Sequence, residues 1–112
     1  MLDVPSNSDV SIYATKADTV LETTLSRGRK ENTTVGEGSF AFGNNVEASG
    51  IYSMAIGINS VASGTISYAE GAASTASGVM SHAEGQSTAS GILSHAEGNQ
   101  TIASNQASHA EG

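Results

Sequence analysis

The sequence lacks several residue types on which common folds and sites depend. Its 112 residues include no cysteine, no tryptophan, one proline, and only two Phe and three Tyr. Without cysteine there is no disulfide framework, no thiolate metal site and no cysteine nucleophile. The small residues Ser, Ala, Gly and Thr dominate instead. This composition excludes an ordinary core of interdigitated large aliphatic and aromatic side chains.

Positive charge is scarce and confined to one end of the chain. The net charge is −7, and the four basic residues are Lys16, Arg27, Arg29 and Lys30, so none lies beyond Lys30. Nucleic-acid surfaces and electrostatic membrane anchors both need clustered bases. No apolar run approaches the ~20 residues of a membrane-spanning helix. The sequence therefore predicts neither a nucleic-acid partner nor a membrane partner.

An internal repeat organises the chain from about residue 31 onward. The pentad Ser-x-Ala-x-Gly occurs six times at a 14-residue period, with a single 13-residue step. Its copies are residues 39–43, 53–57, 67–71, 81–85, 94–98 and 108–112. A second motif, Ala-Ser-Gly, recurs between the pentads, and the missing residue falls between Gly85 and Ala89. Two motifs that stay in register across so much of the chain indicate a repeat architecture rather than disorder.

A coil of this length suits a parallel β-solenoid, with two short strands and two tight turns in each coil. The period is too short for a helix pair, and the recurring glycines disfavour helices. We expect those glycines to supply turn angles that other residues avoid. Because strand side chains alternate between faces, Ala55 is expected inside the coil while Met54 and Ile56 point outward. The alanines of the second motif, such as Ala62, should line the opposite inner wall. We therefore predict an all-β repeat domain over residues 31–112.

Residues 1–30 lie outside the repeat and are predicted to form a short connector that packs on the first coil. Val10, Ile12 and Ala14 alternate with polar residues, which is typical of a short strand. Residues 17–25 carry a capping-box pattern and are expected to form one or two helical turns.

Large apolar side chains recur on the outward face of the early coils. A coil lined by small residues cannot bury them, so we expect them to contact a neighbouring copy of the chain. The predicted interface between copies comprises Phe40, Phe42, Met54, Ile56, Tyr68, His82, Glu84, His95, Glu97, His109 and Glu111.

The later coils carry His-x-Glu on that same face. His82, His95 and His109 are candidate metal ligands, because imidazole and carboxylate both bind metals and a threefold axis would gather three histidines. The alternative is a polar trimer interface in which His of one chain bonds Glu of the next. We favour the polar interface, and we predict no cofactor, no catalytic residue and no enzymatic activity.

The pattern Ser-x-Ala-x-Gly with Ala-Ser-Gly at a 14-residue period resembles the head repeats of YadA-like trimeric adhesins. That resemblance implies a left-handed parallel β-roll in an intertwined or side-by-side homotrimer. The form Ser-His-Ala-Glu-Gly is similar to a variant found in tail-fibre and appendage proteins of phages and prophages. The stretch 25–36 resembles the segment that usually leads into the repeats there.

The resemblance implies a structural, host-attachment role as a stalk or head in a phage or prophage tail fibre, located in the virion. Its partner would be a cell-surface receptor, protein or glycan. One alternative is a head segment of a bacterial surface adhesin that binds host matrix. Another is a non-catalytic part of a polysaccharide-degrading fibre. Because the chain ends directly after a pentad at Gly112, without the cap that a solenoid needs, we expect it to be part of a longer fibre.

Overall fold

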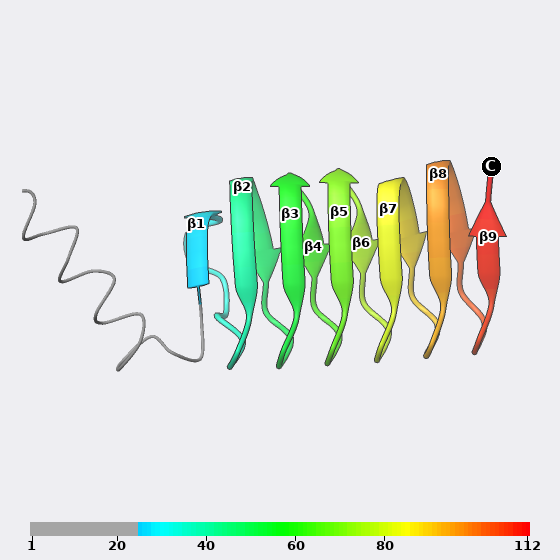
Figure 1. Cartoon of the computed structure of the whole chain (residues 1–112), viewed down its shortest axis with the longest axis horizontal. Coiled ribbons are helices and arrows are strands. Elements are labelled where there is room, and N and C mark those ends of the chain that lie inside the picture. Colours follow the sequence, from blue (N-terminus) through cyan, green and yellow to red (C-terminus); the bar gives the residue numbers. More distant parts are fainter. Residues whose placement is uncertain (1–24) are drawn as a thin grey trace, which may run out of the picture.

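A computed structural model describes residues 25–112, which form a parallel β-solenoid (Figure 1). Successive strands lie side by side along one axis, from β1 at one end to β9 at the other. The strands are β1 (Leu25–Arg29), β2 (Phe40–Ala48), β3 (Met54–Ile58), β4 (Val61–Ala62), β5 (Tyr68–Ala72), β6 (Thr75–Ala76), β7 (His82–Ala89), β8 (His95–Ala103) and β9 (His109–Glu111). Every pairing between them is parallel. Residues 25–112 contain no helix that is long and apolar enough to cross a membrane.

Each coil has two faces that continue through the stack. The first face contains β1, β3, β5, β9 and the starts of β2, β7 and β8. The second face contains β4, β6 and the ends of β2, β7 and β8. Ala55 is the register partner of Ala69, the equivalent residue of the next pentad, which confirms the predicted coil length. The 13-residue step also lies where predicted, because the register between β7 and β8 shifts between Gln86 and Thr88.

The core is a double row of alanines with serines at its edges. Ala55, Ala69, Ala83 and Ala96 on the first face and Ala62, Ala76 and Ala89 on the second have no exposed surface, so the predicted facing is confirmed. Among the fully buried side chains the largest is Val46. Buried hydroxyls need hydrogen-bond partners, and the serine before each first-face strand has one. The Oγ of Ser53, for example, donates to the carbonyl of Gly50 at 2.7 Å, a bond that each later coil repeats.

The recurring glycines are required mainly because stacked backbones approach closely. Gly57 has a φ of 121°, an angle that other residues avoid, which agrees with the expectation for the recurring glycines. Gly64, however, does not have a positive φ; the left-handed residue of its turn is Ile66, with a φ of 56°. A Cβ on Gly64 would instead lie 2.1 Å from the carbonyl oxygen of Gly78 in the next coil. The expectation about turn angles is therefore wrong for the Ala-Ser-Gly glycines, which leave room for the neighbouring coil.

The sheet begins earlier than the boundary expected from the repeat. Strand β1 pairs in parallel with β2, with Leu25 opposite Phe40 and Arg27 opposite Phe42. Residues 25–29 extend the stack by one strand that packs on the first full coil, because their backbone pairs with its edge. Leu25 lies in this strand and not in a helical turn. The strand expected around Val10 and the remainder of the helical segment lie outside the described residues.

Arg29 occupies an inward position at this end of the stack. It is the register partner of the buried Val46. Its guanidinium donates to the carbonyl of Ala48 at 2.9 Å and to the Oγ of Ser39 at 3.2 Å. Burial lowers the pKa of Arg29. The Arg29 side chain therefore provides hydrogen bonds to polar groups at the start of the core. The coils farther along have Ala and Ser at their buried positions.

Candidate functional site

The outward side chains of the first face form two rows that run along the stack. The ring row contains Phe40, Met54, Tyr68, His82, His95 and His109. The carboxylate row begins with Phe42 and Ile56 and continues with Glu70, Glu84, Glu97 and Glu111. The structure thus brings every residue of the predicted interface onto one face of the chain. Glu70 was missed, although its place in the pentad 67–71 matches that of Glu84 in the next one.

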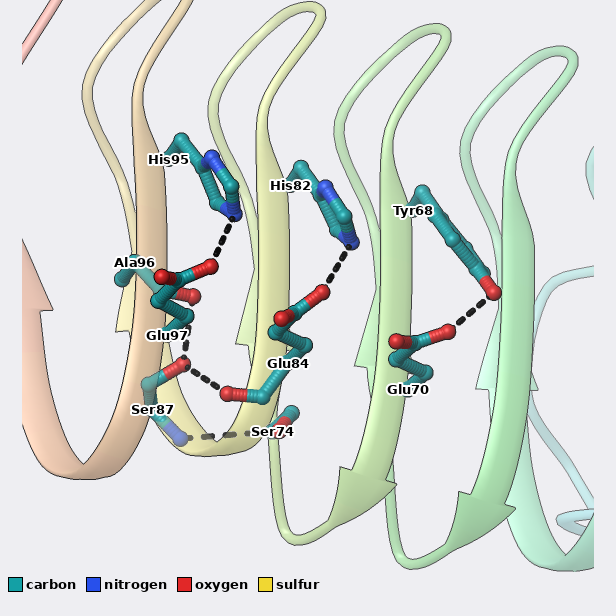
Figure 2. A network of polar contacts seen from close by, with 9 residues as sticks. All are labelled: Tyr68, Glu70, Ser74, His82, Glu84, Ser87, His95, Ala96 and Glu97. Atoms are coloured by element: carbon teal, nitrogen blue, oxygen red, sulfur yellow. Dashed lines mark hydrogen bonds and ion pairs between the residues drawn. The ribbon is translucent and has the colours of Figure 1, made fainter. Parts of the chain in front are cut away.

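The aromatic and imidazole rings of the ring row stack on one another (Figure 2). Ring centroids are 4.7 Å apart between Tyr68 and His82, 4.6 Å between His82 and His95, and 4.8 Å between His95 and His109. The two histidine pairs lie within 7° of parallel. These separations match the spacing of paired strands, so the backbone repeat itself sets the stack.

Each ring pairs with the carboxylate two residues farther along its own strand. The Nε2 of His82 lies 3.2 Å from the Oε1 of Glu84, and the corresponding distance is 3.3 Å in the other two His-x-Glu pairs. The two side chains meet within a strand, because residues i and i+2 project from the same face. The carboxylates are thereby partnered inside each chain.

The Tyr68 phenol donates a hydrogen bond to the carboxylate of Glu70 (Figure 2). This bond raises the pKa of Tyr68 to about 12, with further contributions from burial and from the charges of Glu70 and Glu84. Glu84 belongs to the next coil, so the carboxylates of the row act on groups beyond their own strand.

The histidine nitrogens are close to the carboxylates but poorly aligned with them. The Nε2 atoms of His82 and His95 are shielded from solvent and make no hydrogen bond of good geometry. Two sets of three side chains bring their ligand atoms within 4.8 Å of one another, namely His82, Glu84 and His95, and His95, Glu97 and His109. An open, shallow hollow lined by Glu84, Glu97, Glu111, Gly98 and Gly112 lies beside these groups.

A second apolar surface runs along the turn that precedes the first face. We call it the turn ridge; its residues are Ile51, Tyr52, Ile66, Val79, Met80, Ile92 and Leu93, all exposed. Tyr52 is 61% exposed and Ile66 is 52% exposed. The interface prediction did not include the ridge. A signal was available, since the second position after Ala-Ser-Gly is apolar in four successive coils.

Comparison with known proteins identifies the repeat. Residues 48–65 and 85–104 each match the YadA head domain repeat. Both segments contain an Ala-Ser-Gly turn with its ridge residues, followed by the start of a first-face strand. Neither the curated proteins nor the solved structures gave a match to the chain. These two segments are therefore similar to YadA head repeats, in agreement with the period and the two motifs of the chain.

Proposed function

We propose that the chain is a segment of a homotrimeric attachment fibre, in which three solenoids lie side by side and present a receptor-binding region at a distance. YadA-like head repeats support a surface-exposed, adhesin-like role. The parallel stack is continuous from β1 to β9, with a core of small residues that leaves little room for rearrangement. Such a stack suits a stiff spacer better than a catalytic domain.

The observation that carries the proposal is the presence of two exposed apolar surfaces on one chain. Phe42 and Met54 on the first face are 49% and 37% exposed, and the turn ridge lies beside that face. A threefold ring uses a heterologous interface, in which one patch of a subunit meets a different patch of its neighbour. The first face of one copy and the turn ridge of the next provide such a pair. The first face and the turn ridge have the same spacing along the stack, because each coil contributes residues to both surfaces.

Polar contacts within each strand make burial of the first face feasible. An unpaired buried carboxylate is costly, whereas a partnered one is much less so. Glu70, Glu84 and Glu97 each have a ring partner in their own strand. The face can therefore approach an apolar ridge without requiring a cation from the neighbouring chain, which this region lacks beyond Lys30.

Within this framework we favour a phage or prophage tail fibre, because the Ser-His-Ala-Glu-Gly pentads resemble the variant in those proteins. The match to the YadA head domain repeat supports a second candidate, the head of a bacterial surface adhesin. In the tail fibre the solenoid is a spacer, whereas in the adhesin head the solenoid itself binds host matrix. The two roles also require different downstream domains, a self-cleaving chaperone domain or a membrane anchor.

Light scattering of the purified chain tests the assembly. The expected mass is three times the 11.2 kDa of one chain. A purely monomeric species at micromolar concentration would contradict the proposal, since assembly follows mass action. The Ile66→Ser/Met80→Ser/Leu93→Ser variant should dissociate, whereas Val61→Thr/Thr75→Ser on the second face should remain trimeric. Binding of the trimer to immobilised matrix proteins then separates the two roles, because only the adhesin head is expected to bind.

A further inference from the structure

We propose that the His-x-Glu row binds one divalent transition-metal ion per chain, such as Zn²⁺, with His95 as the shared ligand. The ligands come from β7, β8 and β9. They lie on one chain, so the site does not rest on the proposed trimer.

The distance between ring and carboxylate fits a chelating pair. Zn²⁺ binds His nitrogen and carboxylate oxygen at about 2.0–2.2 Å, so two ligand atoms of a tetrahedral site lie about 3.3–3.6 Å apart. The His82 and Glu84 atoms are 3.2 Å apart, and the His95 and Glu97 atoms are 3.3 Å apart. Each His-x-Glu pair can thus supply two ligands with little movement.

The third ligand comes from the next coil. His82 and His95 are register partners in adjacent strands, and their Nε2 atoms belong to a set with Glu84 in which all atoms lie within 4.8 Å of one another. Side chains that are about one-third exposed, like these three, can tilt to close such a set around an ion. Water would complete the coordination, as it does in open zinc sites.

Two further observations favour a cation at this place. The Nε2 atoms of His82 and His95 are shielded from solvent but make no hydrogen bond of good geometry. The carboxylates of Glu84, Glu97 and Glu111 line one open hollow beside them. A cavity lined by charges of one sign raises the local concentration of counter-ions.

The two candidate sets share His95, which limits the stoichiometry. One set is His82, Glu84 and His95, and the other is His95, Glu97 and His109. A single Nε2 lone pair cannot serve both sets at once. In the coil before β7, Tyr68 takes the place of histidine, and its hydroxyl donates a hydrogen bond to Glu70. The row therefore holds one ion, in either of two overlapping positions.

Calorimetric titration of the tag-free chain with ZnCl₂ tests the proposal. We expect one ion per chain with a dissociation constant in the micromolar range or tighter, and a tetrahedral absorption band when Co²⁺ replaces Zn²⁺. His95→Gln removes a ligand from both sets and should weaken binding by about tenfold or more. His82→Gln and His109→Gln are matched controls, because each leaves one set intact and should still bind one ion.

These side chains point outward from the coil, so the metal-free variants should retain the circular dichroism spectrum of the parent. The absence of Zn²⁺ binding at millimolar concentration would overturn the proposal. A stoichiometry of two would also overturn it, as would three single variants with equal losses, because either result shows that His95 is not shared.

Discussion

The imidazole rings of His82 and His95 stack 4.6 Å apart and 7° from parallel because the two residues are register partners in adjacent parallel strands. The same register aligns Glu84 with Glu97. A feature of one pentad therefore becomes a continuous row on the surface of the solenoid. The consequences for stability and assembly can be tested one position at a time.

Ala69→Leu should destabilise the fold by about 1–3 kcal/mol, as overpacking of a tight core does. Ala69 has no exposed surface and lies in a core whose largest fully buried side chain is Val46. Ala72 is a matched control, because it lies on the same strand but is exposed. The free energies of unfolding of Ala69→Leu and Ala72→Leu, measured with denaturant, should therefore differ by most of that amount. Equal unfolding of the two variants would show that the assignment of inner and outer faces is wrong.

Gly64→Ala should destabilise the fold by more than the ~1 kcal/mol that separates Gly from Ala at unstrained sites. The added Cβ would lie 2.1 Å from the carbonyl oxygen of Gly78, so the stacked coils would have to separate. Ala73→Gly is the control, because Ala73 already has a φ of 61° and glycine adopts that angle readily. The melting temperature should fall clearly for Gly64→Ala and stay unchanged for Ala73→Gly. If Gly64→Ala melts with the parent, close approach is not the reason for this glycine.

The phenol of Tyr68 should have a pKa of about 12 rather than the ordinary pKa of 10.0, because it donates a hydrogen bond to Glu70. A folded-state pKa above the unfolded-state value means that the phenol stabilises the fold fully below pH 10 and loses this contribution as pH rises toward 12. The tyrosinate absorbance of the parent minus that of Tyr68→Phe isolates this group.

Glu70→Gln should lower the pKa of Tyr68, since it removes the charged acceptor. Ionisation of Tyr68 near pH 10 in the parent would show that the hydrogen bond to Glu70 does not form in solution.

Arg29→Gln should destabilise the start of the solenoid by about 1.5–3 kcal/mol, the range for hydrogen bonds to charged groups. The variant loses the bonds from Arg29 to the carbonyl of Ala48 and to the hydroxyl of Ser39. Arg27→Gln is the matched control, because Arg27 lies on the same strand but is exposed. Amide hydrogen exchange should show faster opening of β1 and β2 in Arg29→Gln alone. Unchanged protection in that variant would mean that Arg29 does not stabilise this end.

The sequence predicted the features that depend on local periodicity. The coil length and the position of the 13-residue step follow from the spacing of the repeated pentads. The inward direction of Ala69 follows from the alternation of side chains within each strand. The structure confirms all three features. The members of the outward rows also follow from this alternation, since a strand that buries Ala83 must expose His82 and Glu84.

The features that the sequence did not predict depend on contacts between coils or on side-chain geometry. The role of Gly64 becomes visible only when the next backbone is in place beside it. Arg29 reaches Ala48, which is distant in sequence, so no local pattern indicates that contact. The contact between His82 and Glu84 depends on side-chain reach.

The arrangement of three chains can be measured by thiol cross-linking, because the protein has no cysteine of its own. Ile56→Cys on the first face is combined in turn with Tyr52→Cys, Ile66→Cys or Met80→Cys on the turn ridge, and a short bifunctional maleimide is added. If face and ridge meet between copies, at least one combination gives a covalently closed trimer, and each single variant stays uncross-linked. The pair Ile56→Cys with Val61→Cys, whose second residue lies in β4 on the second face, should give none. Covalent dimers from the single variants, or no cross-linked species from any face–ridge pair, would contradict the side-by-side trimer.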